Sequence, residues 1–501
     1  MGELPQPTRW TPRLLVLAAC ACSALVGYRV WTVLYLRQPG LIITSGCEEE
    51  SLFAIWKFAN GQPVYSNPET IPYAVSYFNF LFYKSYGLWS EAWLTILGLS
   101  DSWLPTLARC LTLVVLLANV LVLRQIMKEA DLIPANFGTA AAWSAALLPF
   151  INPMVGLWVF TARPDWLAIL FELLGLLWLL RHQRQGGGAR LVMACIFLYA
   201  AWATKQSSVA IVTAWCLLNL ARRRWRDVGL VAGLLVTAFG LTCLLGNSAY
   251  RQSVFFSQRY MRLDLEQGVQ YFVIACQEYP LLGLGILALG IWGWRFRARF
   301  RNAPMQLLSW CFLISLLWAF VAAMKSAANT NYFYLSGALS MLWLLALLRS
   351  AVIADARFDP GWWAACVLLI AAVVQLAVGR RAIEQTDFRI EQKKWMVLTA
   401  RLTSLPGPQL VTVRAGNLPW IQPHAPYFVV GTTYPYDRQA GVIFERGGLG
   451  GLVAAGYFSV VAVSRDDPAA TIDGTPLTSY RLENEDAYFR YYVRTDVHTG
   501  Q

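Results

Sequence analysis

The chain is divided by a series of long apolar stretches, each bounded by short basic or polar segments. A hydrocarbon core of about 30 Å needs about 20 apolar residues in a helix to cross it. Such stretches recur from residue 13 to residue 379, whereas charged residues make up only 14% of the chain. A chain in which 57% of the residues are hydrophobic cannot bury them all in one aqueous core. The sequence therefore predicts an integral membrane protein.

The apolar stretches predict about eleven membrane spans. Those near 166–181, 191–203 and 335–348 are short enough to be tilted or to cross only part of the bilayer. The expected spans lie near residues 13–35, 103–123, 136–158, 166–181, 191–203, 207–221, 228–246, 280–294, 306–324, 335–348 and 361–379.

Basic residues gather in alternate connecting loops. Cytoplasmic loops carry an excess of Lys and Arg, so we expect these loops, and with them the N-terminus, in the cytoplasm. Because the net charge of +12 lies where it faces anionic lipid, membrane lipids are the expected partner and nucleic acid is not. The residues are Arg124, Lys128, Arg181, Arg184, Arg190, Arg222, Arg223, Arg224, Arg226, Arg295, Arg297, Arg299, Arg301, Arg349 and Arg357.

The sequence changes character at about residue 380. Charged residues and prolines become more frequent, and apolar runs shorten to strand length at 409–413, 427–430 and 457–463, with a short helix expected at 447–455. We therefore expect a mainly α, polytopic membrane domain at 1–379 and a small extracytoplasmic α/β domain at 380–501. An external loop at 36–102 interrupts the membrane domain.

Three consecutive glutamates, Glu48, Glu49 and Glu50, begin a helical segment in this external loop. Neighbours on a helix point about 100° apart, so one or two of them can face a common site. The others are expected to be solvated or to favour the helix N-terminus, where negative charge is stabilised. The alternative is an acidic helix start at a water-exposed interface. The apolar residues that follow predict a helix lying flat on the membrane surface.

Polar motifs follow several spans on the same external side. Residues 163–165 read Arg-Pro-Asp, residues 204–206 read Thr-Lys-Gln, and Asn331 and Tyr332 precede the tenth span. A lysine as close to hydrocarbon as Lys205 is costly unless it is paired or used. It could snorkel to the headgroups, pair with Asp165 or bind phosphate. Arg259, in the loop before the eighth span, could also bind phosphate.

Histidine is too sparse to predict a metal site. The chain has three histidines, His182, His424 and His498, and none has the spacing of a metal ligand. The sequence also lacks a P-loop and a dinucleotide-binding fingerprint, so no nucleotide cofactor is expected.

The order of these motifs resembles the GT-C superfamily of polytopic glycosyltransferases. The nearest groups are bacterial relatives of the protein O-mannosyltransferases, the aminoarabinose transferases and the Rgt-type lipopolysaccharide transferases. Their first external loop carries an acidic motif, an amphipathic helix and a Gly-x-x-x-Tyr turn, which matches EEESLFAIWKFANGQPVY ending at Tyr65. This chain has Glu-Glu where Asp-Glu is usual. Arg-Pro-Asp, Thr-Lys-Gln and Asn-Tyr-Phe also have counterparts in many bacterial members.

The resemblance implies sugar transfer from a polyprenyl-phosphate donor to a glycan, lipid or protein hydroxyl at the external face of a bacterial inner membrane. It implies an inverting reaction in which Glu49 or Glu48, with Glu50 as the third candidate, is the general base. A divalent cation is an option that the sequence leaves without histidine ligands. The residues expected to bind substrate are Arg163, Asp165, Lys205, Gln206, Tyr65, Asn331, Tyr332 and Arg259.

Two other classes of protein are compatible with the sequence. A transporter or flippase for a lipid-linked substrate would have the same hydropathy, although repeated halves and polar residues near the middle of spans are scarce. A non-catalytic assembly protein could use the tail as a binding module.

Overall fold

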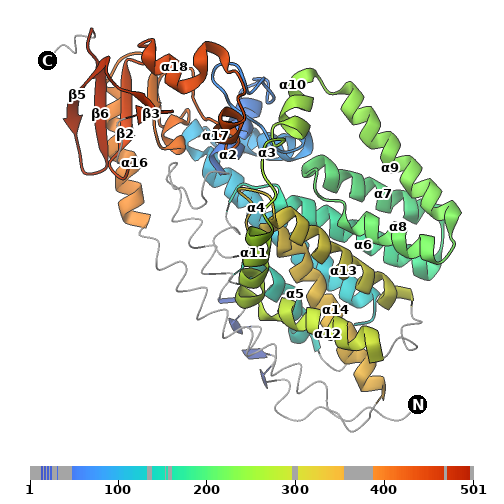
Figure 1. Ribbon diagram of the computed structural model, residues 1–501. Helices are drawn as coiled ribbons and strands as arrows, with labels where there is room; N and C mark the ends of the chain where they lie inside the picture. The colour runs from blue at the N-terminus through green and yellow to red at the C-terminus, as the bar shows by residue number, and fades with distance from the viewer. Residues whose placement is uncertain are drawn as a thin grey trace.

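Helices dominate the chain, and one small region of sheet lies near the C-terminus (Figure 1). The computed structural model describes residues 48–132, 138–152, 154–155, 161–295, 303–354, 388–467 and 471–496, together with single residues between 13 and 31. The principal helices are α2 (Glu48–Ala59), α3 (Phe80–Leu97), α4 (Leu104–Glu129), α5 (Gly138–Ile151), α6 (Asp165–Gln185), α7 (Gly188–Thr204), α8 (Ala210–Ala221), α9 (Trp225–Leu245), α10 (Ser248–Arg251), α11 (Leu265–Glu278), α12 (Pro280–Arg295), α13 (Ala303–Ala323), α14 (Tyr334–Ala354), α16 (Phe388–Thr403), α17 (Tyr434–Gln439) and α18 (Gly448–Ala454).

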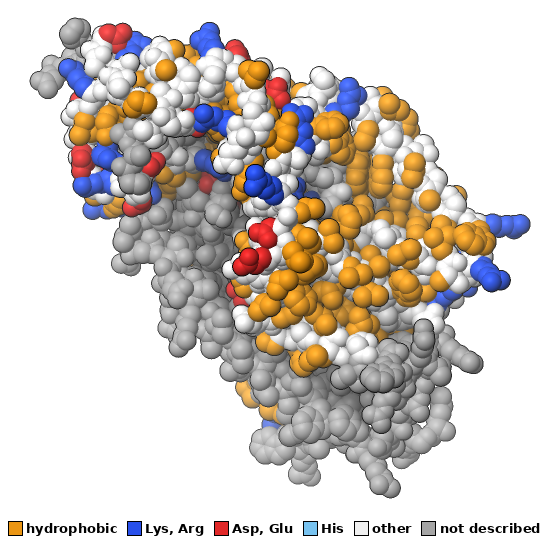
Figure 2. Space-filling model, viewed as in Figure 1, with side chains coloured by type: hydrophobic (Ala, Val, Ile, Leu, Met, Phe, Trp, Pro, Cys, Tyr) orange, Lys and Arg blue, Asp and Glu red, His pale blue; other side chains and the backbone are white. Residues whose placement is uncertain are grey.

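The helices from α4 to α14 form one lobe of the molecule, with α6 packed against α4 and α7, and α13 against α8 and α14. Figure 2 shows hydrophobic side chains over much of the visible face of this lobe. Helix α9 contributes Leu234, Val236 and Leu244, which are all exposed. The loop between α8 and α9 exposes basic residues instead, among them Arg223. An exposed apolar belt next to a basic loop is the surface of a membrane protein.

Three stretches in the described part of the chain are long and apolar enough to cross a membrane, Asp101–Glu129, Trp225–Leu245 and Pro304–Ala323. A fourth is added if α11 and α12, which meet at an angle of 106°, form one broken span. The expected count of eleven spans is therefore not confirmed. Helices α7 and α8 are apolar but shorter than 18 residues, and the expected last span, 361–379, lies outside the described residues.

Helix α2 is buried along most of its length, from Glu48 to Lys57. It packs against α3 and α4, and the Trp56 ring lies edge-on to Tyr427 from the C-terminal region. The Trp56 indole also donates a hydrogen bond of 2.7 Å to Asp101. The prediction of a helix lying flat on the membrane surface is therefore wrong, because protein covers the face that was expected to meet lipid.

The C-terminal region is built on a four-stranded sheet with the order β1-β2-β6-β5. Strands β1 (Gln409–Val411) and β2 (Val460–Ser464) are parallel, and the antiparallel strand β6 (Phe489–Arg494) separates β2 from β5 (Tyr480–Glu485). Strands β3 (Thr471–Ile472) and β4 (Thr475–Pro476) form a separate ladder. The expected α/β character is confirmed, but 427–430 is not a strand. The expected domain boundary near residue 380 lies outside the described residues.

Part of the core of this region comes from the loop that follows α2. Tyr73 is fully buried among Phe428, Tyr434 and Phe444, and its hydroxyl donates a 2.7 Å hydrogen bond to the Glu445 carbonyl. Ala74 forms an isolated antiparallel bridge with Val430. The loop and the C-terminal region therefore share one hydrophobic core.

Replacing Tyr73 by alanine should weaken this shared core. Removing a buried aromatic ring costs about 3–5 kcal/mol, so we expect protection against amide hydrogen exchange in residues 409–496 to fall by a similar amount. Helices α6 and α13 should keep their protection. Tyr260→Ala is the matched control, because that ring is 38% exposed. Unchanged exchange in Tyr73→Ala would contradict the shared core.

Candidate active site

A cavity of about 210 Å³ opens where the loops after α2, α7 and α13 meet the C-terminal region. Three basic side chains line it, and no Asp or Glu among the described residues does so. We call it the cationic cavity. Its lining residues are Tyr77, Phe78, Arg163, Lys205, Gln258, Met261, Tyr271, Lys325, Ser326, Ala327, Ala328, Asn329, Asn331, Tyr332 and Thr432.

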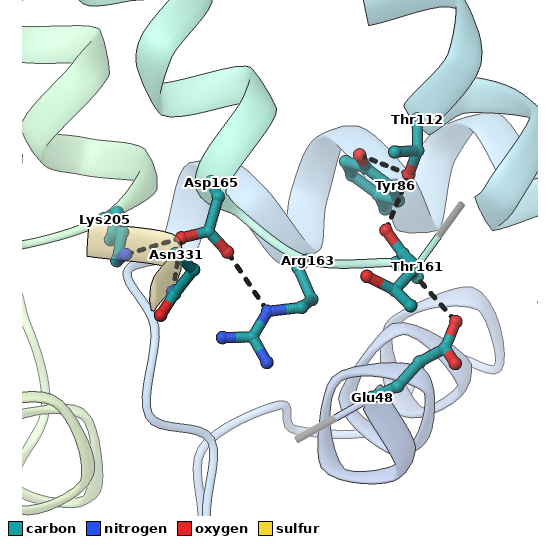
Figure 3. Close-up of polar contacts among 9 residues, drawn as sticks. Glu48, Tyr86, Thr112, Thr161, Arg163, Asp165, Lys205 and Asn331 are labelled. Carbon is teal, nitrogen blue, oxygen red and sulfur yellow. Dashed lines mark hydrogen bonds and ion pairs between the residues drawn. The ribbon is translucent and has the colours of Figure 1, made fainter. Parts of the chain in front are cut away.

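The side chains of three predicted motifs converge on Asp165, the first residue of α6 (Figure 3). Lys205 Nζ lies 2.7 Å from Asp165 Oδ1, and Arg163 Nε lies 3.1 Å from Oδ2. Asn331 Nδ2 donates to Oδ1 at 2.8 Å. Burial alone would raise the pKa of the Asp165 carboxyl, but Lys205 and Arg163 hold it well below its usual range. Of the alternatives for Lys205, the ion pair with Asp165 is the one that the structure shows.

The local backbone explains why these groups meet. Helix α7 ends at Thr204, and Lys205 takes an extended conformation that carries it out of the helix. On α6, Pro164 occupies the N-cap, where its missing N–H costs nothing. The Asp165 carboxylate therefore stands in the first turn, where the helix dipole stabilises negative charge.

One aromatic residue, Tyr332, and one basic residue, Lys325, from the turn before α14 complete the cavity wall. Lys205 Nζ lies 4.6 Å from the centre of the Tyr332 ring, a cation–π distance. Lys325 Nζ hydrogen-bonds the side-chain oxygen of Gln258, and no described carboxylate lies within ion-pair distance of it. Burial, with a contribution from Lys205, lowers the Lys325 pKa to about 8. Lys325 stands in the same turn as the predicted binding residues Asn331 and Tyr332 but is not among them.

Charge counting indicates what the cavity can hold. Arg163 and Lys205 share the single charge of Asp165, and Lys325 adds another positive charge. The excess of positive charge in a partly buried hollow favours an anion. Phosphate is one of the anions that Arg and Lys bind through strong charge-assisted hydrogen bonds.

Glu48 lies behind the part of the cavity wall that Arg163 forms. Its two carboxylate oxygens accept hydrogen bonds of 2.9 Å each from Arg109 Nε and Nη2 on α4. Its Oε1 also accepts from the Ala162 backbone N–H at 3.1 Å, next to Arg163. The pair is almost completely buried, so each charge requires the other.

Glu50 faces the C-terminal region. Its Oε1 accepts a 2.7 Å hydrogen bond from the Thr432 hydroxyl and lies 3.3 Å from Arg414 Nη1. Burial raises the pKa of Glu50 to about 8, against the opposing effect of Arg414. Thr432 also lines the cationic cavity, so the acidic helix reaches the cavity wall a second time.

Glu49 lies between these two contacts along α2. It is buried, and its Oε2 has no hydrogen-bond partner among the described residues. Burial raises its pKa from 4.5 to about 7. The alternative of solvated glutamates is therefore wrong, because all three are at most 4% exposed. Their place in the first turn of α2 agrees with the other alternative, in which they favour the helix N-terminus. One or two of the glutamates were expected to face the site, but none of them lines the cationic cavity. Arg109 holds Glu48 and Thr432 holds Glu50 behind the cavity wall.

The remaining predicted residues do not line the cavity. Gln206 donates to the backbone carbonyls of Tyr77 and Val254, and Tyr65 donates to the Phe78 carbonyl. Both hold the loop that supplies the cavity wall. Arg259 forms a half-exposed ion pair of 3.7 Å with Glu69. The structure thus brings together Arg163, Asp165, Lys205, Asn331 and Tyr332.

The cation that the resemblance allows remains a prediction. Within the described ranges, no three His, Cys, Asp or Glu side chains converge in a way that could hold a metal ion.

Comparison with known proteins supports the fold. No protein-family model and no curated protein matches the chain. ArnT from Cupriavidus metallidurans, solved bound to undecaprenyl phosphate, is 13% identical with a TM-score of 0.57, over 95% of this chain and 98% of ArnT. The chain has the GT-C fold.

Archaeal structures give the same result. The Archaeoglobus fulgidus oligosaccharyltransferase in complex with Zn and sulfate is 13% identical with a TM-score of 0.53, over 96% of this chain and 73% of that one. The AglB oligosaccharyltransferase of the same organism, with an inhibitory peptide and a dolichol-phosphate, is 13% identical with a TM-score of 0.51, over 98% and 75%. The expected GT-C resemblance is thereby confirmed at the level of the fold.

The raised pKa values of Glu49 and Glu50 should make the chain less stable as the pH rises. Above pH 4.5 the unfolded chain releases protons that the folded chain keeps, so the free energy of unfolding falls until about pH 7 for Glu49 and about pH 8 for Glu50. Glu49→Gln should remove the part of this pH-dependent fall in the free energy of unfolding that Glu49 causes, on the order of 3 kcal/mol. Its Tm, followed by circular dichroism in detergent, should decline less between about pH 5 and pH 8 than that of Glu91→Gln, an exposed control. Parallel declines would contradict the buried proton on Glu49.

Proposed function

We propose that the chain transfers a sugar from a polyprenyl-phosphate donor to a hydroxyl group of a glycan, lipid or protein. The observation that carries this proposal is the cationic cavity beside a buried acidic helix, within the GT-C fold. The cavity supplies the charge for a phosphate, and the helix supplies the carboxylate for a hydroxyl. ArnT, which has the same fold, was solved with undecaprenyl phosphate.

The donor phosphate would occupy the cationic cavity. A phosphodiester carries one negative charge, and the phosphate monoester that leaves carries a second. Because charge develops on the departing oxygen, cations fixed around it stabilise the transition state more than the ground state. Lys205 and Arg163 are fixed by Asp165, so little reorganisation is needed. Lys325 contributes the charge that no described carboxylate balances.

Glu49 is the glutamate best suited to act as general base. Arg109 takes both oxygens of Glu48, and Thr432 and Arg414 bind Glu50. Glu49 Oε2, like Glu50 Oε2, has no hydrogen-bond partner among the described residues. The pKa of Glu49, about 7, is nearer than that of Glu50, about 8, to the working pH that suits proton transfer. Glu49 would take the acceptor proton as the hydroxyl oxygen attacks the anomeric carbon. The bond from that carbon to the phosphate oxygen then breaks, with inversion.

The reaction would take place on the external face of a bacterial inner membrane. Helix α9 is apolar and exposed, and it begins at the basic loop that follows α8 and ends before α10 (Figure 1). The basic loop and the chain that follows α9 therefore lie at opposite ends of this helix. Basic loops favour the cytoplasm, so the cationic cavity would face outward, together with the C-terminal region.

Glu49→Gln should abolish most transfer. Loss of a general base costs about 10²- to 10⁴-fold in rate, whereas Glu91→Gln, an exposed change on α3, should leave the rate unchanged. The assay is transfer from a polyprenyl-phosphate sugar in vesicles containing the full chain. In the wild type, kcat/KM should rise with pH through about 7 as Glu49 loses its proton. Wild-type activity in Glu49→Gln would remove Glu49 from the mechanism.

Lys325→Met should weaken donor binding. A hydrogen bond to a charged group is worth about 1.5–3 kcal/mol, which corresponds to a roughly 10- to 100-fold rise in donor KM. The acceptor KM should not change. Lys84→Met, an exposed lysine on α3, is the matched control, and an equal donor KM in the two variants would place the phosphate elsewhere.

A further inference from the structure

A second hollow of about 210 Å³ lies within the C-terminal region. We call it the Arg414 pocket. Nothing in the proposed mechanism uses it. Its lining residues are Leu410, Val411, Thr412, Arg414, Asn417, Phe428, Val430, Gly431, Tyr434, Pro435, Leu449, Asp467, Thr471, Ile472 and Asp473.

The sheet topology places this pocket where α/β folds usually bind ligands. Thr412 and Arg414 follow strand β1, and Asp467 follows strand β2. Because β1 and β2 are parallel, these residues emerge at the same edge of the sheet. Small molecules bind outside the carboxyl ends of parallel strands in such folds.

The lining selects for a neutral group with many hydroxyls. The Arg414 guanidinium donates hydrogen bonds, the Asp467 carboxylate accepts them, and the Thr471 hydroxyl does both. An anion would meet the Asp467 carboxylate, and a cation would meet Arg414. The Asp473 carboxylate is paired with Arg438, and Arg414 is paired with Glu50. Apolar residues, including Phe428 and Leu449, form much of the rest of the wall and can cover the C–H face of a ring.

The size of the pocket narrows the ligand further. Pockets for drug-sized molecules measure roughly 300–1,000 Å³, so a hollow of about 210 Å³ suits a single small ring. A monosaccharide unit has these properties, because its hydroxyls both donate and accept hydrogen bonds and its ring has apolar C–H faces.

A single segment of backbone, at Gly431 and Thr432, separates this pocket from the cationic cavity. Gly431 lines the Arg414 pocket, and Thr432, the next residue, lines the cationic cavity. A Cβ on Gly431 would come within 2.5 Å of the Tyr77 hydroxyl, so the partition is closely packed. Arg414 Nη1 lies 2.9 Å from the Thr432 hydroxyl and 3.3 Å from Glu50. The pocket therefore adjoins the acidic helix.

We propose that the Arg414 pocket binds a monosaccharide unit of the acceptor, one position away from the hydroxyl that receives the new sugar. This inference rests on the proposed sugar transfer for the identity of the acceptor. The pocket holds the acceptor through a sugar that does not react, while the cationic cavity holds the donor.

Thr471→Trp tests the proposal by filling the pocket from its exposed rim on β3. Thr478→Trp is the matched control, because Thr478 is also exposed and lies outside the pocket lining. We expect about a tenfold rise in acceptor KM for Thr471→Trp, with donor KM and donor hydrolysis unchanged. An acceptor KM equal to that of Thr478→Trp, or a rise in donor KM alone, would overturn the proposal.

A binding measurement separates this inference from the proposed function. Methyl glucoside, methyl mannoside and methyl galactoside are offered to the full chain in sugar-free lipid nanodiscs, and contact is read by saturation-transfer difference NMR. Signal in the wild type and Thr478→Trp, but not in Thr471→Trp, supports the pocket even if the chain transfers no sugar. Absent signal in the wild type, or equal signal in all three proteins, overturns it.

A second variant keeps the test valid if Thr471→Trp does not fold. Asp467→Asn removes a carboxylate from the pocket rim without adding volume. It should weaken the same NMR signals and raise acceptor KM several-fold, and unchanged binding together with unchanged KM would overturn the proposal.

Discussion

The arrangement of the site depends on the burial of one carboxylate. Asp165 holds Lys205, Arg163 and Asn331 together, and these residues come from the ends of different helices. Because a buried charge without a partner costs several kcal/mol, the three segments cannot separate cheaply. Asp165 nevertheless balances only part of the positive charge around the cavity, since Lys325 has no described carboxylate within ion-pair distance. The same interaction that fixes the wall therefore leaves a net attraction for anions.

Helix geometry gives the three glutamates different contact partners. Consecutive side chains on α2 point in different directions, so Glu48 reaches Arg109 on α4 and Glu50 reaches Thr432 in the C-terminal region. These two contacts fix the helix on both sides. Glu49, between them, is left in a buried position that raises its pKa. An acidic run that could serve as a solvated helix start thus becomes two anchors and one buried carboxyl group with a raised pKa.

The convergence of the polar motifs could be predicted from the sequence, because the alternation of basic loops places Asp165, Lys205 and Asn331 on the same side of the expected membrane spans. The burial of α2 could not. Its covering partners, Tyr427 and Thr432, are far away in sequence, and the Glu50–Thr432 contact spans 382 positions. The turn that begins at Lys325 is recognisably polar in the sequence, but the place of Lys325 beside Lys205 depends on packing that the sequence does not show. Hydropathy also could not distinguish short buried helices such as α8 from complete spans.

The shared core of Tyr73 and the C-terminal region has a consequence for biosynthesis. Tyr73 packs on Phe428 and Phe444, and its hydroxyl bonds to a residue 372 positions later. Chains grow from the N-terminus, so the segment around Tyr73 waits for the last part of the chain before it can fold. Until then Glu50 also lacks Thr432 and Arg414. A ribosome that stalls before these residues therefore leaves a bundle of helices in which Thr432 is missing from the wall of the cationic cavity and α2 lacks its C-terminal contacts.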